Sequence, residues 1–236
     1  MSKEKSKILN KRNIIIIFLV LITAFMYRNV FIYTYMHYTY EPKEVDGQLE
    51  PPFPSYSSAF GTIQGADVNK NGLRDDLEIF ANEILNDLPY ELREVTKLEL
   101  KNWSLFTTQD MGTAERKKWW LDKLRIDRCF NFLESSVESP IELNQMFDVM
   151  DDLRDRIGNT SERQKAVDIN RQGMITNHYL DINISIYNIV AICDGMKINL
   201  CKVVKNTLGS SNKWRPRSYQ LQPKIYKSFY EKCHKK

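Results

Sequence analysis

The most apolar stretch of the chain lies close to its start. Residues 14–26 are apolar except for Thr23, and the apolar character resumes at residues 30–33. A helix rises about 1.5 Å per residue, so residues 14–33 would cover roughly 30 Å, the thickness of a bilayer's hydrocarbon core. Arg28 lies near the outer end, where its guanidinium can reach the interface. The pattern predicts a transmembrane helix over residues 13–35.

Basic residues precede this segment. Residues 1–12 contain five Lys or Arg and one acid, Glu4. Because positive flanks stay in the cytoplasm, we expect a cytoplasmic tail over residues 1–12 and an extracytoplasmic location, periplasmic or at the cell surface, for the rest of a single-pass membrane protein. A cleaved signal peptide is the alternative, with Ile22-Thr23-Ala24 as a poor cleavage site. Both interpretations place the body of the protein outside the cytoplasm.

Residues 36–64 are rich in proline and serine and contain few aliphatic residues. Proline lacks a backbone N–H and interrupts helices, so no helix is expected to run through this segment. We interpret it as a linker between the membrane segment and a domain over residues 65–236.

Helical periodicity dominates the domain. The first apolar stripe repeats every three or four residues from Leu77 to Leu88, and further helices are expected from Pro89 and after Thr113. Capping signals at residues 139–142 and 159–162 predict two more helix starts, and Pro223 begins a last amphipathic segment. Residues 180–190 alternate like a strand but lie in a stretch long enough for a helix, and we favour helix. The expected fold class is all-α.

Charge argues against a nucleic-acid partner. The net charge of +4 arises from 34 Lys and Arg against 30 Asp and Glu, but residues 1–40 alone carry six basic residues and one acid, which is +5. The remainder therefore sums to −1. Binding to phosphates requires a concentrated positive field, which this balance does not provide.

The chain contains four cysteines, Cys129, Cys193, Cys201 and Cys233, without a C-x-x-C pair. In an oxidising compartment they predict two structural disulfides, for which three pairings are possible. Four buried reduced thiols are the alternative.

One short window carries the main candidate chemistry. Residues 67–78, "DVNKNGLRDDLE", place oxygen-bearing groups at positions 1, 3, 5, 7, 9 and 12 of a twelve-residue loop. Gly72, at position 6, suits the sharp bend such a loop needs. Calcium takes six to eight oxygen ligands, so the window predicts a Ca²⁺ site. The expected ligands are the side chains of Asp67, Asn69, Asn71, Asp75 and Glu78 and the backbone carbonyl of Leu73.

This window resembles the calcium loop of the EF-hand family and of related extracellular loops such as those of dockerins. It is also similar to loops that follow a membrane segment in exported bacterial proteins, a likeness that implies no activity. Two features differ from paired EF-hands: no convincing helix precedes Asp67, and Arg74 occupies the eighth position, which is usually aliphatic. The resemblance therefore implies a solitary, structural ion, with an affinity on the order of 10⁻⁴ to 10⁻³ M.

A plain polar turn is the alternative interpretation of this window. Asp75 could cap the following helix, with Glu78 as its partner three residues on, and Asn71-Gly72 is a common turn. This alternative does not explain why Asp67 and Asn69 also lie at ligand positions of the same twelve-residue loop.

The sequence predicts no catalytic site. His178 and Asp181 lie three residues apart and could pair, but no third partner is evident. We therefore expect a module that binds or scaffolds an envelope protein or polymer. The alternative is a hydrolase of envelope polymers that uses His178 with an acid such as Glu115 or Asp181.

Overall fold

The computed structural model describes residues 11–136, 143–177 and 189–199. These residues are mainly helical, and the expected all-α class is confirmed. The elements, in chain order, are α1 (Lys11–Met26), α2 (Arg28–Thr39), β1 (Glu44–Val45), β2 (Gln48–Leu49), α3 (Tyr56–Phe60), α4 (Asp75–Ile84), α5 (Tyr90–Thr108), α6 (Thr113–Ser136), α7 (Leu143–Ile157), α8 (Ser161–Thr176) and α9 (Ile189–Gly195).

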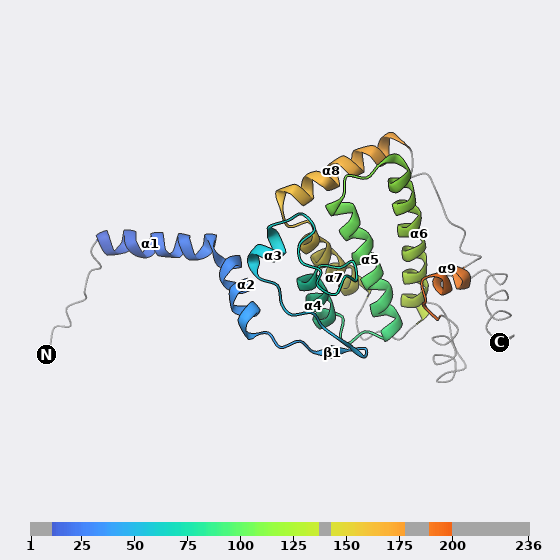
Figure 1. Ribbon diagram of the computed structural model, residues 1–236, viewed down its shortest axis with the longest axis horizontal. Helices are drawn as coiled ribbons and strands as arrows, with labels where there is room; N and C mark the ends of the chain where they lie inside the picture. The colour runs from blue at the N-terminus through green and yellow to red at the C-terminus, as the bar shows by residue number, and fades with distance from the viewer. Residues whose placement is uncertain (1–10, 137–142, 178–188, 200–236) are drawn as a thin grey trace.

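The body is a bundle built around α5. Helix α5 packs against α6, α7 and α8, while α4 packs against α7 and α9 against α6. Figure 1 shows α5 and α6 side by side, α8 across one end of the bundle, and α1 extending away from it. The helix starts expected at Pro89, after Thr113 and at residues 159–162 agree with α5, α6 and α8.

Two apolar clusters fill the bundle. The larger joins α4, α5, α6, α7 and α9 and contains the stripe expected from the sequence, with Leu77, Leu85 and Leu88 almost fully buried. Helix α4 ends at Ile84, so Leu85 and Leu88 reach the core from the turn that follows it. The smaller cluster joins α5, α6 and α8 around Phe106 and Trp119, whose rings stack at 4.1 Å between centroids.

The N-terminal segment is two helices rather than one. Helices α1 and α2 meet at Tyr27 with a bend of 59°. Tyr27 has φ −97° and ψ 9°, a bridge conformation outside the helical region. No single helix of the described residues is long and apolar enough to cross a membrane, although the bent pair satisfies the requirement together. The continuous helix expected over residues 13–35 is therefore broken, and membrane crossing stays a prediction.

The segment expected to be a linker packs on the domain. Phe53 is 1% exposed and Ala59 is fully buried, and both form a third cluster with Tyr33 and Ile79. The segment contains the β1–β2 hairpin, in which Glu44 lies opposite Leu49, and the five-residue helix α3, whose N-cap Ser55 follows Pro54. The prolines thus limit helix length, as expected, but its aromatic residues hold the segment against α2 and α4.

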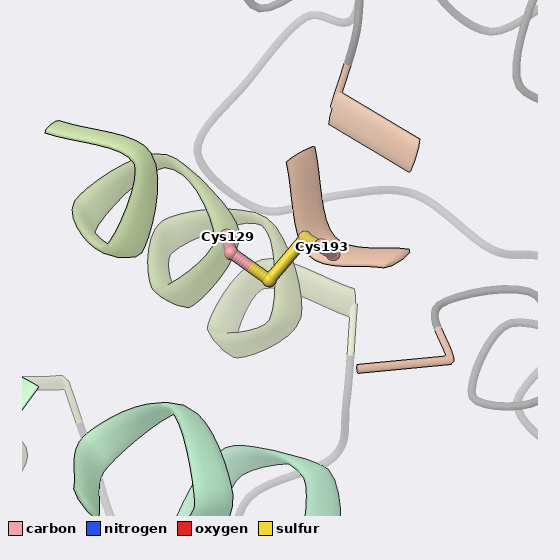
Figure 2. The surroundings of a disulfide bond; sticks show 2 residues. All are labelled: Cys129 and Cys193. Atoms are coloured by element: carbon pink, nitrogen blue, oxygen red, sulfur yellow. A yellow bond between two sulfur atoms is a disulfide. The ribbon is translucent and has the colours of Figure 1, made fainter. Parts of the chain in front are cut away.

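A disulfide joins Cys129 of α6 to Cys193 of α9, 64 residues apart in the chain (Figure 2). It selects one of the three pairings left open by the sequence. Cys201 and Cys233, the capping signal at residues 139–142, the ambiguous residues 180–188 and the segment from Pro223 lie outside the described residues.

Candidate metal centre

The predicted calcium loop connects α3 to α4 and folds back on itself before α4 begins. The backbone N–H of Asp75 donates to the carbonyl of Ala66 at 2.8 Å, which closes the loop at its base. Lys70 and Gly72 have φ of +56° and +85°, so the chain turns twice through the left-handed region. Gly72 adopts this conformation without strain, as the sequence predicted for the sixth position.

Asp67 organises the first half of the loop. Its Oδ1 accepts a hydrogen bond from the backbone N–H of Asn71 at 3.1 Å, and its Oδ2 accepts one from Gly72 at 2.9 Å. These bonds orient the Asp67 carboxylate toward the inside of the turn.

Glu78 closes the second half of the loop. Its Oε2 accepts hydrogen bonds from Nδ2 of Asn69 at 2.9 Å and from Nδ2 of Asn71 at 2.7 Å. The amide oxygen of Asn69 accepts from the backbone of Asn71 at 3.2 Å, and that of Asn71 accepts from Leu73 at 2.8 Å. The side chains at positions 3 and 5 therefore both contact the carboxylate at position 12.

Asp75 lies under the loop and is fully buried. Its two carboxylate oxygens accept from the backbone N–H of Val68 at 3.0 and 3.2 Å. Burial raises the pKa of Asp75 to about 6, and the negative charges of Asp67, Glu78 and Asp76 add to this rise, against the opposing effect of the Val68 hydrogen bond. The carboxylate is thus held where a positive charge would stabilise its ionised form.

Of the five side chains that the sequence named as ligands, the structure joins three, Asn69, Asn71 and Glu78, by hydrogen bonds. The carboxylates of Asp67 and Asp75 bond instead to backbone N–H groups of the loop. Within the described residues, no group of three or more His, Cys, Asp or Glu side chains is arranged to hold a metal ion. The sixth expected ligand is the carbonyl of Leu73, whose side chain is 1% exposed and anchors the loop in the larger core.

The polar-turn alternative predicted a cap that the structure does not form. Arg74, rather than Asp75, is the N-cap of α4, and its side chain makes no capping hydrogen bond. Asp75 is the first residue of the helix, and its carboxylate bonds across the loop to Val68. Glu78 bonds to the two asparagines. Both acids therefore bond to groups of the loop rather than to the N–H groups of the helix start.

A buried ion pair next to the loop was not anticipated from the sequence. Arg74 Nε and Nη2 donate to the two carboxylate oxygens of Asp76 at 2.6 and 3.0 Å, and Nη2 also donates to the carbonyl of Arg156 on α7 at 3.1 Å. Tyr33 of α2 donates its hydroxyl to Asp76 at 2.5 Å. In the sequence Arg74 is only a departure from the EF-hand pattern, and nothing in its spacing from Asp76 predicts a contact with α2.

A second buried arginine holds the entry to the loop. Arg163 of α8 is fully buried and donates to the carbonyls of Ala59 at 2.9 Å, Ile63 at 2.8 Å and Thr62 at 3.3 Å, and to Oδ1 of Asn159 at 2.7 Å. Burial lowers the pKa of Arg163 to about 10, and the positive charge of Arg74 contributes to this shift. At this pKa the guanidinium still carries its charge at neutral pH.

The residues named for a hydrolase gain no support. His178 and Asp181 lie outside the described residues. Glu115 is exposed, and its Oε2 accepts from the backbone N–H of Gly112 at 2.8 Å, so it caps the start of α6.

Comparisons with known proteins give no relative for this chain. No family model matches it, and no match was found among curated proteins or among solved structures.

Proposed function

We propose that this protein is a membrane-anchored, extracytoplasmic module whose loop 67–78 binds one structural Ca²⁺. The observation that carries the proposal is the contact of Asn69 and Asn71 with Glu78, which closes a twelve-residue loop whose first carboxylate, Asp67, is already turned inward. Five side chains and the Leu73 carbonyl offer at least six oxygens, as many as a hard cation such as calcium requires.

The loop needs only a local change to hold the ion. The Asn69 and Asn71 amides donate to Glu78 through nitrogen, and a half-turn of each amide presents its oxygen instead. This turn exchanges the bonds that the two oxygens accept from the backbone N–H groups of Asn71 and Leu73 for bonds to the ion. The ion then takes over the role of the amide N–H groups and offsets the repulsion among Asp67, Asp75 and Glu78. Calcium also favours the ionised form of Asp75, whose pKa is raised by burial and by these neighbours.

A structural role suits the position of the loop better than a sensing role. The loop precedes α4 and is joined to α7 through Arg74, while its entry is joined to α8 through Arg163. It is a solitary loop and has no partner loop within the described residues, whereas sensors open by moving paired loops. An ion here would stabilise the junction of three helices on which a binding or scaffolding surface depends.

The anchor and the compartment belong to the same proposal. The bent pair of α1 and α2 satisfies the length and composition of a membrane span, and the five basic residues before it favour a cytoplasmic N-terminus. The bond between Cys129 and Cys193 is typical of an oxidising compartment such as the cell envelope. An envelope protein or polymer is the expected partner.

The test is a calorimetric calcium titration of the full chain in detergent, with thermal melts in calcium and in chelator. We expect one site with Kd on the order of 10⁻⁴ to 10⁻³ M. Calcium at ten to a hundred times Kd then stabilises the fold by about 1.4 to 2.7 kcal/mol.

Matched variants locate the site. Asp67→Asn and Glu78→Gln should each abolish the binding heat, whereas Asp87→Asn and Glu83→Gln, the same changes at exposed positions, should preserve it. Absence of binding heat together with superposable melts of the parent protein would refute the calcium site.

A further inference from the structure

Helix α2 presents two different faces, and the body of the protein covers only one of them. On the covered face Tyr33 is 8% exposed and donates its hydroxyl to Asp76. Met36 and Tyr40 pack against the same cluster, and Nδ1 of His37 lies 2.7 Å from the carbonyl oxygen of Phe53. Contacts from three successive turns therefore hold this face against the domain.

The opposite face carries large apolar and aromatic side chains that no part of the described structure covers. Phe31, Ile32, Tyr35 and Tyr38 are 63%, 45%, 68% and 80% exposed. Their spacing of one, four and seven residues from Phe31 places them on one side of a helix. Four such residues on one face of a twelve-residue helix indicate an interaction surface.

The connection to α1 indicates what this surface meets. Only Tyr27 separates α2 from α1, whose apolar residues 14–26 would enter the hydrocarbon core. Residues 14–26 cover about 20 Å of a core roughly 30 Å thick, and the basic residues Lys11, Arg12 and Arg28 flank them in the sequence. Long basic side chains reach outward to the two interfaces from such positions, which sets the hydrocarbon boundary close to the start of α2. Figure 1 shows α1 leaving the body beside α2, with α2 alongside α3.

Because Tyr33 is fixed to the folded domain, α2 cannot continue the path of α1 through the hydrocarbon core. Asp76, Arg74 and the rest of the body are attached to α2 through Tyr33, and a folded polar domain cannot enter the hydrocarbon core. The 59° bend then carries α2 along the boundary rather than deeper into it. With one face on the body, the other face is turned to the lipid.

The amino-acid composition of α2 and of the segment before it suits the lipid headgroup region of a bilayer. Tyrosine and other amphipathic aromatic rings concentrate at the membrane–water interface. Residues 5–40 contain no Asp or Glu, and Arg28 begins α2, so the segment has no charge that anionic lipids would repel.

We propose that Phe31, Ile32, Tyr35 and Tyr38 lie in the headgroup region of the bilayer that α1 enters, so that the domain is seated on the membrane surface. The proposal rests on the membrane anchor proposed above and deepens it, because it assigns the hydrocarbon core to α1 and the interface to α2 of the bent pair. It replaces a domain on a flexible linker with one whose orientation α2 sets. Because Tyr33 bonds to Asp76, the neighbour of Asp75, the calcium loop is attached directly to the membrane-seated helix.

The test measures the depth of single tryptophans in the full chain, reconstituted in vesicles of phosphatidylcholine and phosphatidylglycerol. Lipids brominated near the headgroup or near the chain end quench tryptophan at the corresponding depth. Phe18→Trp reports on α1, Tyr35→Trp and Tyr38→Trp on the outer face of α2, and Tyr90→Trp on the exposed start of α5. The quenching of each introduced tryptophan is the difference between the variant and the parent protein, which has tryptophans of its own. Unchanged thermal melts verify the fold of each variant.

We expect deep bromines to quench Phe18→Trp, and shallow bromines to quench Tyr35→Trp and Tyr38→Trp at least about twofold more than Tyr90→Trp. If Phe18→Trp is quenched but Tyr35→Trp and Tyr38→Trp are quenched no more than Tyr90→Trp, the proposed position of α2 in the headgroup region is wrong. The membrane anchor is still supported in that case. Blue-shifted emission in that case would assign the face to a second protein chain, and red-shifted emission to water. If Phe18→Trp is not quenched, both the anchor and the seating are overturned.

Discussion

The hydroxyl of Tyr33 donates to the Asp76 carboxylate at 2.5 Å, across 43 residues of sequence. This bond joins the segment that follows the predicted membrane helix to the first turn of α4. Asp76 also receives two hydrogen bonds from Arg74, so a tyrosine, an arginine and an aspartate form one buried polar group beside the calcium loop. A buried carboxylate requires such partners, because an unpaired one would be strongly destabilising.

Removing the Tyr33 hydroxyl should destabilise the domain. Tyr33→Phe preserves the ring packing against Phe53 and Phe60, but it deprives the buried Asp76 of one donor. We expect the free energy of unfolding to fall by about 1 to 3 kcal/mol, measured by denaturant titration. The matched control is Tyr35→Phe on the exposed face of the same helix, which should change stability by less than about 0.5 kcal/mol. Equal effects of the two changes would contradict a specific role for the bond.

Replacing Arg163 should loosen the entry to the calcium loop. Arg163→Met fills a similar volume but leaves the carbonyls of Ala59 and Ile63 without the donor that reaches them from α8. We expect a loss of about 3 kcal/mol or more in the free energy of unfolding, because several buried acceptors lose their partner at once. Denaturant titration measures the loss. Arg171→Met, at an exposed position of the same helix, serves as the control and should have little effect.

The response to calcium should depend on pH through Asp75. Its pKa is raised to about 6 in the folded protein, so its contribution to stability is complete below pH 4 and is lost as the pH rises through 6. Calcium binds the ionised carboxylate and reverses this loss. The difference in melting temperature between calcium and chelator should therefore grow from pH 5 to pH 7, and a flat difference would exclude Asp75 as a ligand.

Asp75→Asn provides a second test of that carboxylate. The amide oxygen can still accept from Val68, while the charge that repels Asp67 and Glu78 is removed. In chelator at pH 7 the variant should be more stable than the parent by on the order of 1 to 3 kcal/mol. In calcium it should show almost no further stabilisation. Melting curves in both conditions measure the two effects, and a variant that calcium stabilises as much as the parent would contradict the prediction.

Reduction of the disulfide should affect stability without abolishing calcium binding. Cys129 and Cys193 join α6 to α9, whereas the loop lies between α3 and α4. A bridge that closes a loop of 64 residues stabilises by about 4 kcal/mol in the chain-entropy account. The double variant Cys129→Ala, Cys193→Ala should lose a stability of this order in denaturant and still bind calcium in the calorimeter. Peptide mapping without reductant should recover the Cys129–Cys193 peptide, and a different partner for Cys129 would contradict the structure.

The local features of this protein could be predicted from its amino-acid sequence. Periodic apolar residues and start signals predicted α4, α5, α6 and α8, because helix formation and burial depend on neighbours three and four residues away. The loop at residues 67–78 was equally local: Gly72 provides the bend, and its carboxylates and amides bond to one another within twelve residues.

The features that join distant segments could not be predicted, because they arise from the packing of the folded chain. Nothing local indicated that Tyr33 would bond to Asp76, that Phe53 would be buried in a proline-rich segment, or that Arg163 would bond to the carbonyl of Ala59, 104 residues away. The choice of Cys193 as the partner of Cys129 was also open among three pairings. These contacts depend on how the helices pack, and packing depends on the shapes of whole faces rather than on the spacing of residues along the chain.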